Sequence, residues 1–265
     1  MSTSLFSLFL FISLSSALAA GAPPQSGLDS QAAGSVQTYP LGSLATGTLG
    51  YGQELWKEAD KENNADFWQY GYLRPFAEWK TAALINRFTG ALEFFPISIL
   101  GLSGGGGIDL RNYNKYSGFN CQANMCDHSV TFQYAQAQMI VGYEKFLGVL
   151  TGRYDWYRAE SDKRPFYDEM SYLIGQPGQD NMRTLNLLAL YRQNDTWGFG
   201  GMAIYQRMIY SGANSSSVYG ILNYTQGPWR GTVGLGAYQS SHQVQNPSMI
   251  FSINYTAIKG IGLLN

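Results

Sequence analysis

Apolar and polar side chains alternate with a period of two along most of this chain, which is typical of β-strands with two different faces. Near the end of the chain, Phe251 and Ile253 alternate with small polar residues. Segment 182–192 shows the same pattern, although Leu188 and Leu190 blur it. The repeated alternation predicts an all-β fold.

We predict ten strands, at residues 46–58, 67–83, 87–102, 129–144, 146–158, 182–193, 196–209, 217–226, 230–241 and 248–259. Their connections alternate between tight turns, such as Lys145 and residues 194–195, and long polar loops, such as 103–128 and 159–181. This sorting favours a closed, antiparallel, up-and-down transmembrane β-barrel of about ten strands, with roughly eight to twelve allowed. Greek-key crossings in a soluble secreted β-sandwich, a binding module, would not sort the loops in this way, but that fold is the alternative.

Composition narrows the class of protein further. The six Trp, 19 Tyr and 14 Phe outnumber the 17 basic and 18 acidic residues. So many aromatics exclude a disordered chain, and a net charge of −1 gives no support for nucleic-acid binding. All six tryptophans fall near the ends of predicted strands, where a bilayer interface favours them.

Residues 1–20 are a predicted signal peptide. An apolar stretch from Leu5 to Ala20 ends in the small-residue pattern Ala17-Leu18-Ala19, and it is shorter than the ~20 residues that a membrane-spanning helix needs. A buried core helix is the alternative. We predict a flexible N-terminal tail at residues 21–42, which are rich in Gly, Ala, Ser and Gln, and the barrel at residues 43–265.

If the protein is exported to an oxidising compartment, its two cysteines can form a disulfide. Cys121 and Cys126 are close enough in sequence to form a small disulfide ring that tightens a loop. The alternative is a metal site that also uses Asp127 and His128, but its spacing matches no common zinc pattern. We therefore predict the disulfide and no metal.

The predicted signal peptide, the alternating strands of residues 46–259, the sorted connections and the aromatic positions together resemble the small bacterial outer-membrane β-barrel proteins. The resemblance concerns architecture over most of the mature chain and includes no sequence motif. It implies a bacterial outer-membrane location and contact with outer-membrane lipid. The even number of predicted strands and their sorted connections put both termini on the short-turn side. Loops 103–128 and 159–181 are then the places where we expect lipopolysaccharide or a surface partner to bind.

Alternation also assigns the two faces of the barrel wall. The side chains expected to face lipid include Leu150, Tyr154, Leu185, Leu187, Met249, Phe251 and Ile253. The polar side chains expected to face the lumen are Arg74, Glu78, Lys80, Glu93, Gln136, Gln138, Arg153, Asp155, Arg192 and Arg207. Mixed charges in so narrow an interior are expected to pair into a network that plugs it, and a narrow selective channel is the alternative.

The leading functional prediction is a non-enzymatic role in envelope structure or surface interaction, with limited passage of small solutes. An outer-membrane hydrolase (a protease, lipase or lipid A deacylase) is the alternative, and its candidate bases are the rim histidines His128 and His242. Adjacent strand residues point to opposite faces, so neither histidine has a working partner beside it, and we assign no catalytic residue. The glycine run of residues 104–107 lacks the Lys-Ser/Thr of a phosphate loop, so we predict no cofactor; a flexible loop or a continued strand explains it.

Overall fold

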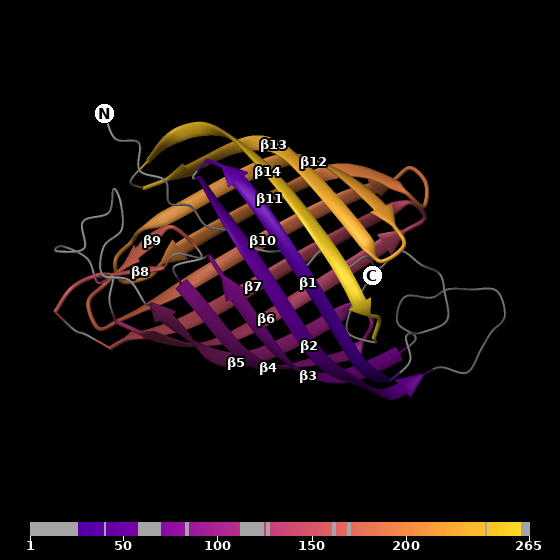
Figure 1. Cartoon of the computed structure of the whole chain (residues 1–265), viewed down its shortest axis with the longest axis horizontal. Coiled ribbons are helices and arrows are strands. Elements are labelled where there is room, and N and C mark those ends of the chain that lie inside the picture. The colour runs from indigo at the N-terminus through magenta and orange to yellow at the C-terminus, as the bar shows by residue number, and fades with distance from the viewer. Residues whose placement is uncertain are drawn as a thin grey trace.

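The computed structural model describes residues 26–39, 41–57, 70–82, 85–111, 125, 128–160, 163–168, 171–241 and 243–260. Within these residues, twelve long strands form a barrel and two short strands form a separate hairpin (Figure 1). No helix in this part of the chain is long and apolar enough to cross a membrane. The barrel strands are β1 (Gly27–Thr38), β2 (Leu41–Lys57), β3 (Tyr70–Thr81), β4 (Ile85–Ile97), β5 (Leu100–Arg111), β6 (Val130–Tyr143), β7 (Phe146–Ala159), β10 (Gln179–Arg192), β11 (Trp197–Met208), β12 (Asn214–Gln226), β13 (Trp229–Ser240) and β14 (Gln243–Ile258).

Each barrel strand pairs antiparallel with its neighbours in the chain, and β1 pairs with β14 to close the sheet, with Gly34 opposite Ile253. The hairpin of β8 (Phe166–Asp168) and β9 (Leu173–Gly175) is inserted between β7 and β10. This confirms the predicted all-β, closed, antiparallel barrel. The strand number is twelve rather than about ten, within the allowed range.

The first missing strand is β1, in the segment predicted to be a flexible tail. Every residue from Gly27 to Thr38 pairs with β2, and much of β1 also pairs with β14. The prediction of a tail at residues 21–42 was therefore wrong for this segment. Its composition of Gly, Ala, Ser and Gln resembles that of a linker, but sheet pairing uses backbone groups, which do not require large side chains.

The second missing strand results from a tight turn that the alternation did not reveal. The predicted strand 87–102 is a hairpin, in which β4 ends at Ile97, a turn occupies Ser98 and Ile99, and β5 begins at Leu100. The turn contains none of the Gly or Asn residues that usually mark one. The glycine run therefore lies in the middle of β5, as a continued strand, and residues 103–111 are strand rather than loop.

These two corrections also change which connections share an end of the barrel. We call the end that carries Gly27 and Ile258 the terminal end, and the opposite end, which carries the β8–β9 hairpin, the loop end (Figure 1). The connection 58–69 belongs to the terminal end, whereas the short connection 82–84 belongs to the loop end, the reverse of the predicted sorting. The loop-end connections 112–129 and 160–178 are the longest, as predicted.

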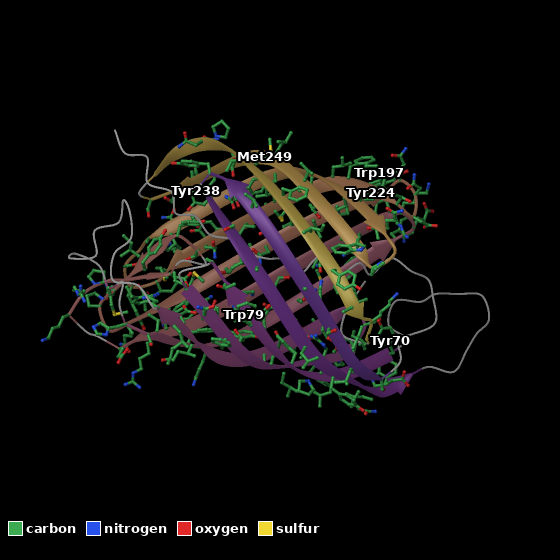
Figure 2. All side chains as sticks on the ribbon, viewed as in Figure 1. Tyr70, Trp79, Trp197, Tyr224, Tyr238 and Met249 are labelled. Atoms are coloured by element: carbon green, nitrogen blue, oxygen red, sulfur yellow. The ribbon has the colours of Figure 1, made fainter. Side chains whose placement is uncertain are left out.

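The outer surface of the barrel is apolar. Six of the seven side chains predicted to face lipid are exposed hydrophobics, including Leu187 at 51% and Met249 at 46%, and Figure 2 labels Met249 on the outer surface. The seventh, Tyr154, is half-buried beside the outward Trp156. Tryptophans stand outward at both ends. Trp56, Trp197 and Trp229 lie at the terminal end, and Trp79 and Trp156 lie at the loop end. An apolar band between two aromatic girdles is the surface that a bilayer requires.

Candidate solute passage in the barrel lumen

A row of ion pairs follows the lumen side of β3 to β7, which we call the charged wall. Arg74 on β3 reaches Asp29 on β1, with Nη2 to Oδ1 at 2.6 Å, and Glu93 on β4, with Nη1 to Oε2 at 2.8 Å. Arg74 crosses β2 at Gly50, where a Cβ atom would lie 2.6 Å from the Arg74 Nε. Glycine at this position therefore leaves the space through which the guanidinium passes.

A second buried cluster lies nearer the loop end. Arg87 on β4 donates from Nε to Asp109 on β5 at 2.5 Å and from Nη2 to Asp168 on the hairpin at 2.7 Å. All three side chains are almost fully buried. Arg153 and Asp155 on β7 form a further pair at 2.6 Å. Because Asp168 belongs to the hairpin, the Arg87 cluster fastens the hairpin to the barrel wall.

The β8–β9 hairpin extends across the lumen. On one side, Arg111 donates from Nη2 to the Tyr167 carbonyl at 2.6 Å, and the buried Phe166 ring lies 5.7 Å from the Tyr157 ring on β7. On the other side, the Tyr172 ring lies 6.2 Å from the Tyr238 ring on β13. Burial raises the pKa of the Tyr172 phenol well above its ordinary value, so this contact stays uncharged. The hairpin thus narrows the lumen at the loop end.

The lumen side of β12, β13, β14 and β1 has a different chemistry, and we call it the hydroxyl wall. Tyr219 donates to Ser248 at 3.0 Å and accepts from the Gln37 amide at 3.1 Å. Thr232 and Asn223 form a further hydrogen bond at 2.5 Å. Apart from Arg230 at the terminal end and Asp29, which belongs to the Arg74 cluster, the described inward side chains of these four strands carry no charge.

The terminal half of the lumen is partly apolar. Leu147, Val149, Leu188 and Leu190 point inward and are buried together with residues of β3, β4, β6, β11 and β12. The stacked rings of Tyr72 and Phe95, with centroids 4.5 Å apart, belong to the same cluster. Leu188 and Leu190, which blurred the alternation of segment 182–192, are therefore inward residues of an apolar section.

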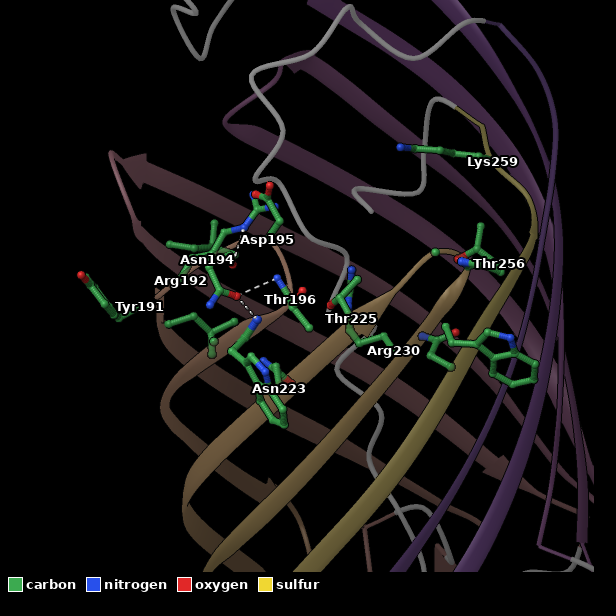
Figure 3. Close-up of a pocket in the computed structure, with 18 of the residues that line it drawn as sticks. Tyr191, Arg192, Asn194, Asp195, Thr196, Asn223, Thr225, Arg230, Thr256 and Lys259 are labelled. Carbon is green, nitrogen blue, oxygen red and sulfur yellow. Dashed lines mark hydrogen bonds and ion pairs between the residues drawn. The ribbon is translucent and has the colours of Figure 1, made fainter.

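A pocket of about 470 Å³ opens at the terminal end, next to this apolar section. Leu147 and Leu190 form its floor, and polar groups of β12 and β14 line its side. Arg192, Arg230 and Lys259 stand around it, and Figure 3 shows them on three separate segments of the rim. Asn194 holds the adjacent turn by accepting from the Thr196 and Trp197 amides at 2.9 and 2.8 Å.

The structure places most of the predicted lumen residues on the inner face, and many of them in ion pairs. Arg74 pairs with Glu93 and Asp29, Arg153 pairs with Asp155, Glu78 pairs with Lys80 at 2.7 Å, and Arg192 pairs with Asp195 at 2.9 Å. Gln136 and Gln138 are half-buried on the inner face of β6. Arg207 is a correction, because it is exposed between the buried Gln206 and Met208 and therefore faces outward.

The prediction missed Asp29, Arg87, Asp109 and Asp168, which complete the two main clusters. Asp29 was assigned to the tail, and Asp109 and Asp168 were assigned to loops. Arg87 was inside the predicted strand 87–102, and its inward direction follows from the same alternation. Correct strand boundaries would thus have identified all but Asp168, which belongs to the hairpin.

The residues of the other predicted sites are only partly described. The His128 side chain is 42% exposed at the loop end, and its Nδ1 lies 3.9 Å from the Glu160 carboxylate. His242, Cys121, Cys126 and Asp127 lie outside the described residues, as does the predicted signal peptide. The disulfide and the rim hydrolase therefore stay predictions.

No protein-family model matches this sequence, and no curated protein matches it. Solved structures do match. The COG4313 outer membrane channel from Pseudomonas putida F1 aligns with a TM-score of 0.53 and 12% identity, over 90% of this chain and 98% of that one. The KdgM porin aligns with a TM-score of 0.44 and 12% identity, over 86% of this chain and 98% of that one. The NanC porin aligns with a TM-score of 0.43 and 10% identity, over 87% of this chain and 99% of that one.

At these identities the likeness concerns the fold alone. The fold is that of bacterial outer-membrane β-barrel proteins, which confirms the predicted resemblance at the level of architecture. The apolar outer band and the two aromatic girdles agree with the predicted location in the bacterial outer membrane.

Proposed function

We propose that this protein is a non-enzymatic outer-membrane barrel that lets small solutes pass along the hydroxyl wall of its lumen. The observation that carries the proposal is the unequal distribution of charge inside the barrel. The charged wall is held in ion pairs, whereas the hydroxyl wall presents Ser, Thr, Tyr, Asn and Gln side chains. Such neutral groups exchange hydrogen bonds with water or solute at little cost.

The hairpin and the pocket support a passage that is narrow rather than open. The β8–β9 hairpin lies between Arg87 and Tyr238 at the loop end, and the pocket widens the lumen at the terminal end. We place the terminal end on the periplasmic side, because long loops face outward in outer-membrane barrels. The fold of the structural neighbour is compatible with this proposal, since the protein with the TM-score of 0.53 is described as a channel.

Liposome swelling tests the passage directly. The purified protein is incorporated into vesicles, which are diluted into isosmotic solutions of neutral solutes of increasing size. We expect swelling with the smallest solutes and a steep loss of rate as size increases, relative to vesicles without protein. Swelling that does not depend on the protein at any solute size would contradict the proposal.

A matched pair of variants shows whether solutes use the lumen. Ser252 faces the lumen from β14, on the hydroxyl wall, and its neighbour Ile253 faces outward at 42% exposure. Ser252→Trp places a large ring in the proposed passage, so it should slow swelling, whereas Ile253→Trp should leave the rate unchanged because a bilayer accepts that side chain. Equal rates in the two variants would show that the solutes take another route.

Binding of lipopolysaccharide or of a surface partner through the long loops is a second prediction, and it concerns segments that are only partly described. The exposed His128 lies at this end of the barrel, so a hydrolase would act there. A double variant His128→Ala and His242→Ala with undiminished swelling would separate any such activity from the passage.

A further inference from the structure

The terminal-end pocket combines a cationic rim with an apolar floor, and neither part is explained by passage of neutral solutes. Arg192, Arg230 and Lys259 line it, and among the described residues that line it the only acidic side chain is Asp195. Asp195 is 99% exposed on the turn and pairs with Arg192 at 2.9 Å. In the part of the chain that the structure describes, three cationic side chains and one acidic side chain therefore line this small volume.

The position of each cation shows that the rim surrounds the pocket. Arg192 is the last residue of β10, Arg230 is the second residue of β13, and Lys259 directly follows β14. In Figure 3, Arg192 lies to the left of Asn223 and Thr225, Arg230 lies to their right, and Lys259 stands above them. A single anionic group held among them would meet positive charge from several directions.

The floor of the pocket has the opposite character. Leu147 is 2% exposed and Leu190 is 9% exposed, and both belong to the apolar cluster that continues into the lumen. Between floor and rim, Asn223, Thr225, Asn254 and Thr256 provide neutral donors and acceptors.

We propose that this pocket binds small amphipathic organic anions, with a carboxylate or similar head at Arg192, Arg230 and Lys259 and an apolar body over Leu147 and Leu190. The inference rests on the proposed function, because it names the class of solute that the passage selects. A volume of about 470 Å³ is large enough for a short aliphatic or monocyclic acid. The site would concentrate such anions at the terminal mouth of the barrel.

Calorimetric titration of the intact protein in lipid nanodiscs tests the binding, with empty nanodiscs as the blank. The probe is hexanoate, compared with hexylammonium and 1-hexanol, which share its apolar body. We expect hexanoate to bind about tenfold more tightly than either comparison compound. Butanoate should bind at least about threefold more weakly than hexanoate, because it covers less of the floor.

Charge-removing variants locate the site. Arg230→Gln should weaken hexanoate binding about tenfold, and Arg192→Gln provides a second test if the first variant fails to fold. Arg158→Gln removes an equal charge from the exposed outer face near the loop end and should leave binding unchanged. Equal affinity for hexanoate and hexylammonium, or undiminished binding in both pocket variants, would overturn the inference.

The swelling experiment separates this inference from the proposed function. If neutral solutes pass but hexanoate does not bind, the passage stands and the anion site is wrong. If hexanoate binds but no solute passes, the pocket is a binding site in a closed barrel, and the proposed passage is wrong.

Discussion

The charged wall and the hydroxyl wall of the lumen differ in how their polar side chains interact. On the charged wall, Arg74, Arg87 and Arg153 pair with buried or partly buried acidic side chains, and Arg74 also ties together strands that are not neighbours, because it reaches from β3 to Asp29 on β1. On the hydroxyl wall, neutral side chains form short local contacts such as Tyr219 with Ser248. Both walls line the lumen with polar side chains, but only the charged wall holds the β8–β9 hairpin by an ion pair, that of Arg87 with Asp168.

The difference between the two walls indicates that charged side chains inside a barrel can serve its stability and do not by themselves imply a route for ions. A buried arginine with two carboxylate partners is costly to separate, so the charged wall is a structural element. Hydrogen bonds between neutral groups contribute only about 0.5–1.5 kcal/mol each and can be exchanged for water. Passage is therefore expected along the hydroxyl wall, and damage to the charged wall should affect stability first.

Breaking the charged wall at Arg87 should have the largest effect. Arg87→Met leaves Asp109 and Asp168 buried without their common partner, which should destabilise the barrel by about 3–5 kcal/mol. Urea unfolding in lipid vesicles measures this loss. Arg158→Met, on the exposed outer face, is the control and should change stability by less than about 0.5 kcal/mol. Similar losses in the two variants would show that the buried cluster has no special role.

The comparison of inner walls presupposes that the other face of each strand meets lipid. Leu187→Arg puts a charge on the outer face near mid-strand and should cost about 2–4 kcal/mol. Asn254→Ser, on the inner face, should have little effect on insertion. The fraction of protein with barrel mobility on unboiled gels reports insertion. Equal tolerance of both changes would contradict the assigned faces.

Blocking the space through which Arg74 crosses β2 should have a smaller effect on stability, confined to one ion-pair cluster. In Gly50→Ala the new methyl group would lie 2.6 Å from the Arg74 Nε, so the ion-pair cluster must shift, at about 1–3 kcal/mol. Gly152→Ala is the matched change, because a Cβ atom there meets nothing within 4 Å. The difference in unfolding midpoint between the two variants measures the effect. Equal unfolding midpoints in the two variants would mean that the Arg74 ion pairs do not depend on the space left by Gly50.

The hydroxyl wall should respond least. Tyr219→Phe removes the hydroxyl shared with Gln37 and Ser248, and we expect a loss of about 0.5–1.5 kcal/mol together with altered swelling rates. Tyr224→Phe removes an exposed hydroxyl that bonds Gln226 and is the control. A loss as large as that of Arg87→Met would remove the distinction between the walls.

The period-two pattern predicted the fold class and the two faces of most strands, because the outward side chains contact lipid and are therefore mostly apolar. It failed where a strand carries no strong alternation. β1 is built from small residues such as Ala33 and Ser35, and the turn at Ser98 and Ile99 lacks the usual turn residues. In both places backbone pairing decides the structure, and side-chain chemistry gives little sign of it.

The site was predicted in part for a related reason. Inward charges within well-bounded strands, such as Arg74, Arg153 and Asp155, were assigned to the correct face. Asp168 could not be assigned to the lumen from the sequence, because its position depends on the hairpin folding back into the lumen. A tertiary contact of this kind leaves no periodic pattern in the sequence. The apolar section was visible only as the irregularity at Leu188 and Leu190.

Conductance across a planar bilayer tests the central claim, which is that the β8–β9 hairpin narrows a passage through the lumen. The wild-type protein is compared with a variant in which a Gly-Ser linker replaces residues 166–175, after the unboiled gel shift has shown that both form barrels. We predict small conductance steps for the wild type and clearly larger steps for the variant. Identical steps, or no protein-dependent conductance in either protein, would contradict the account.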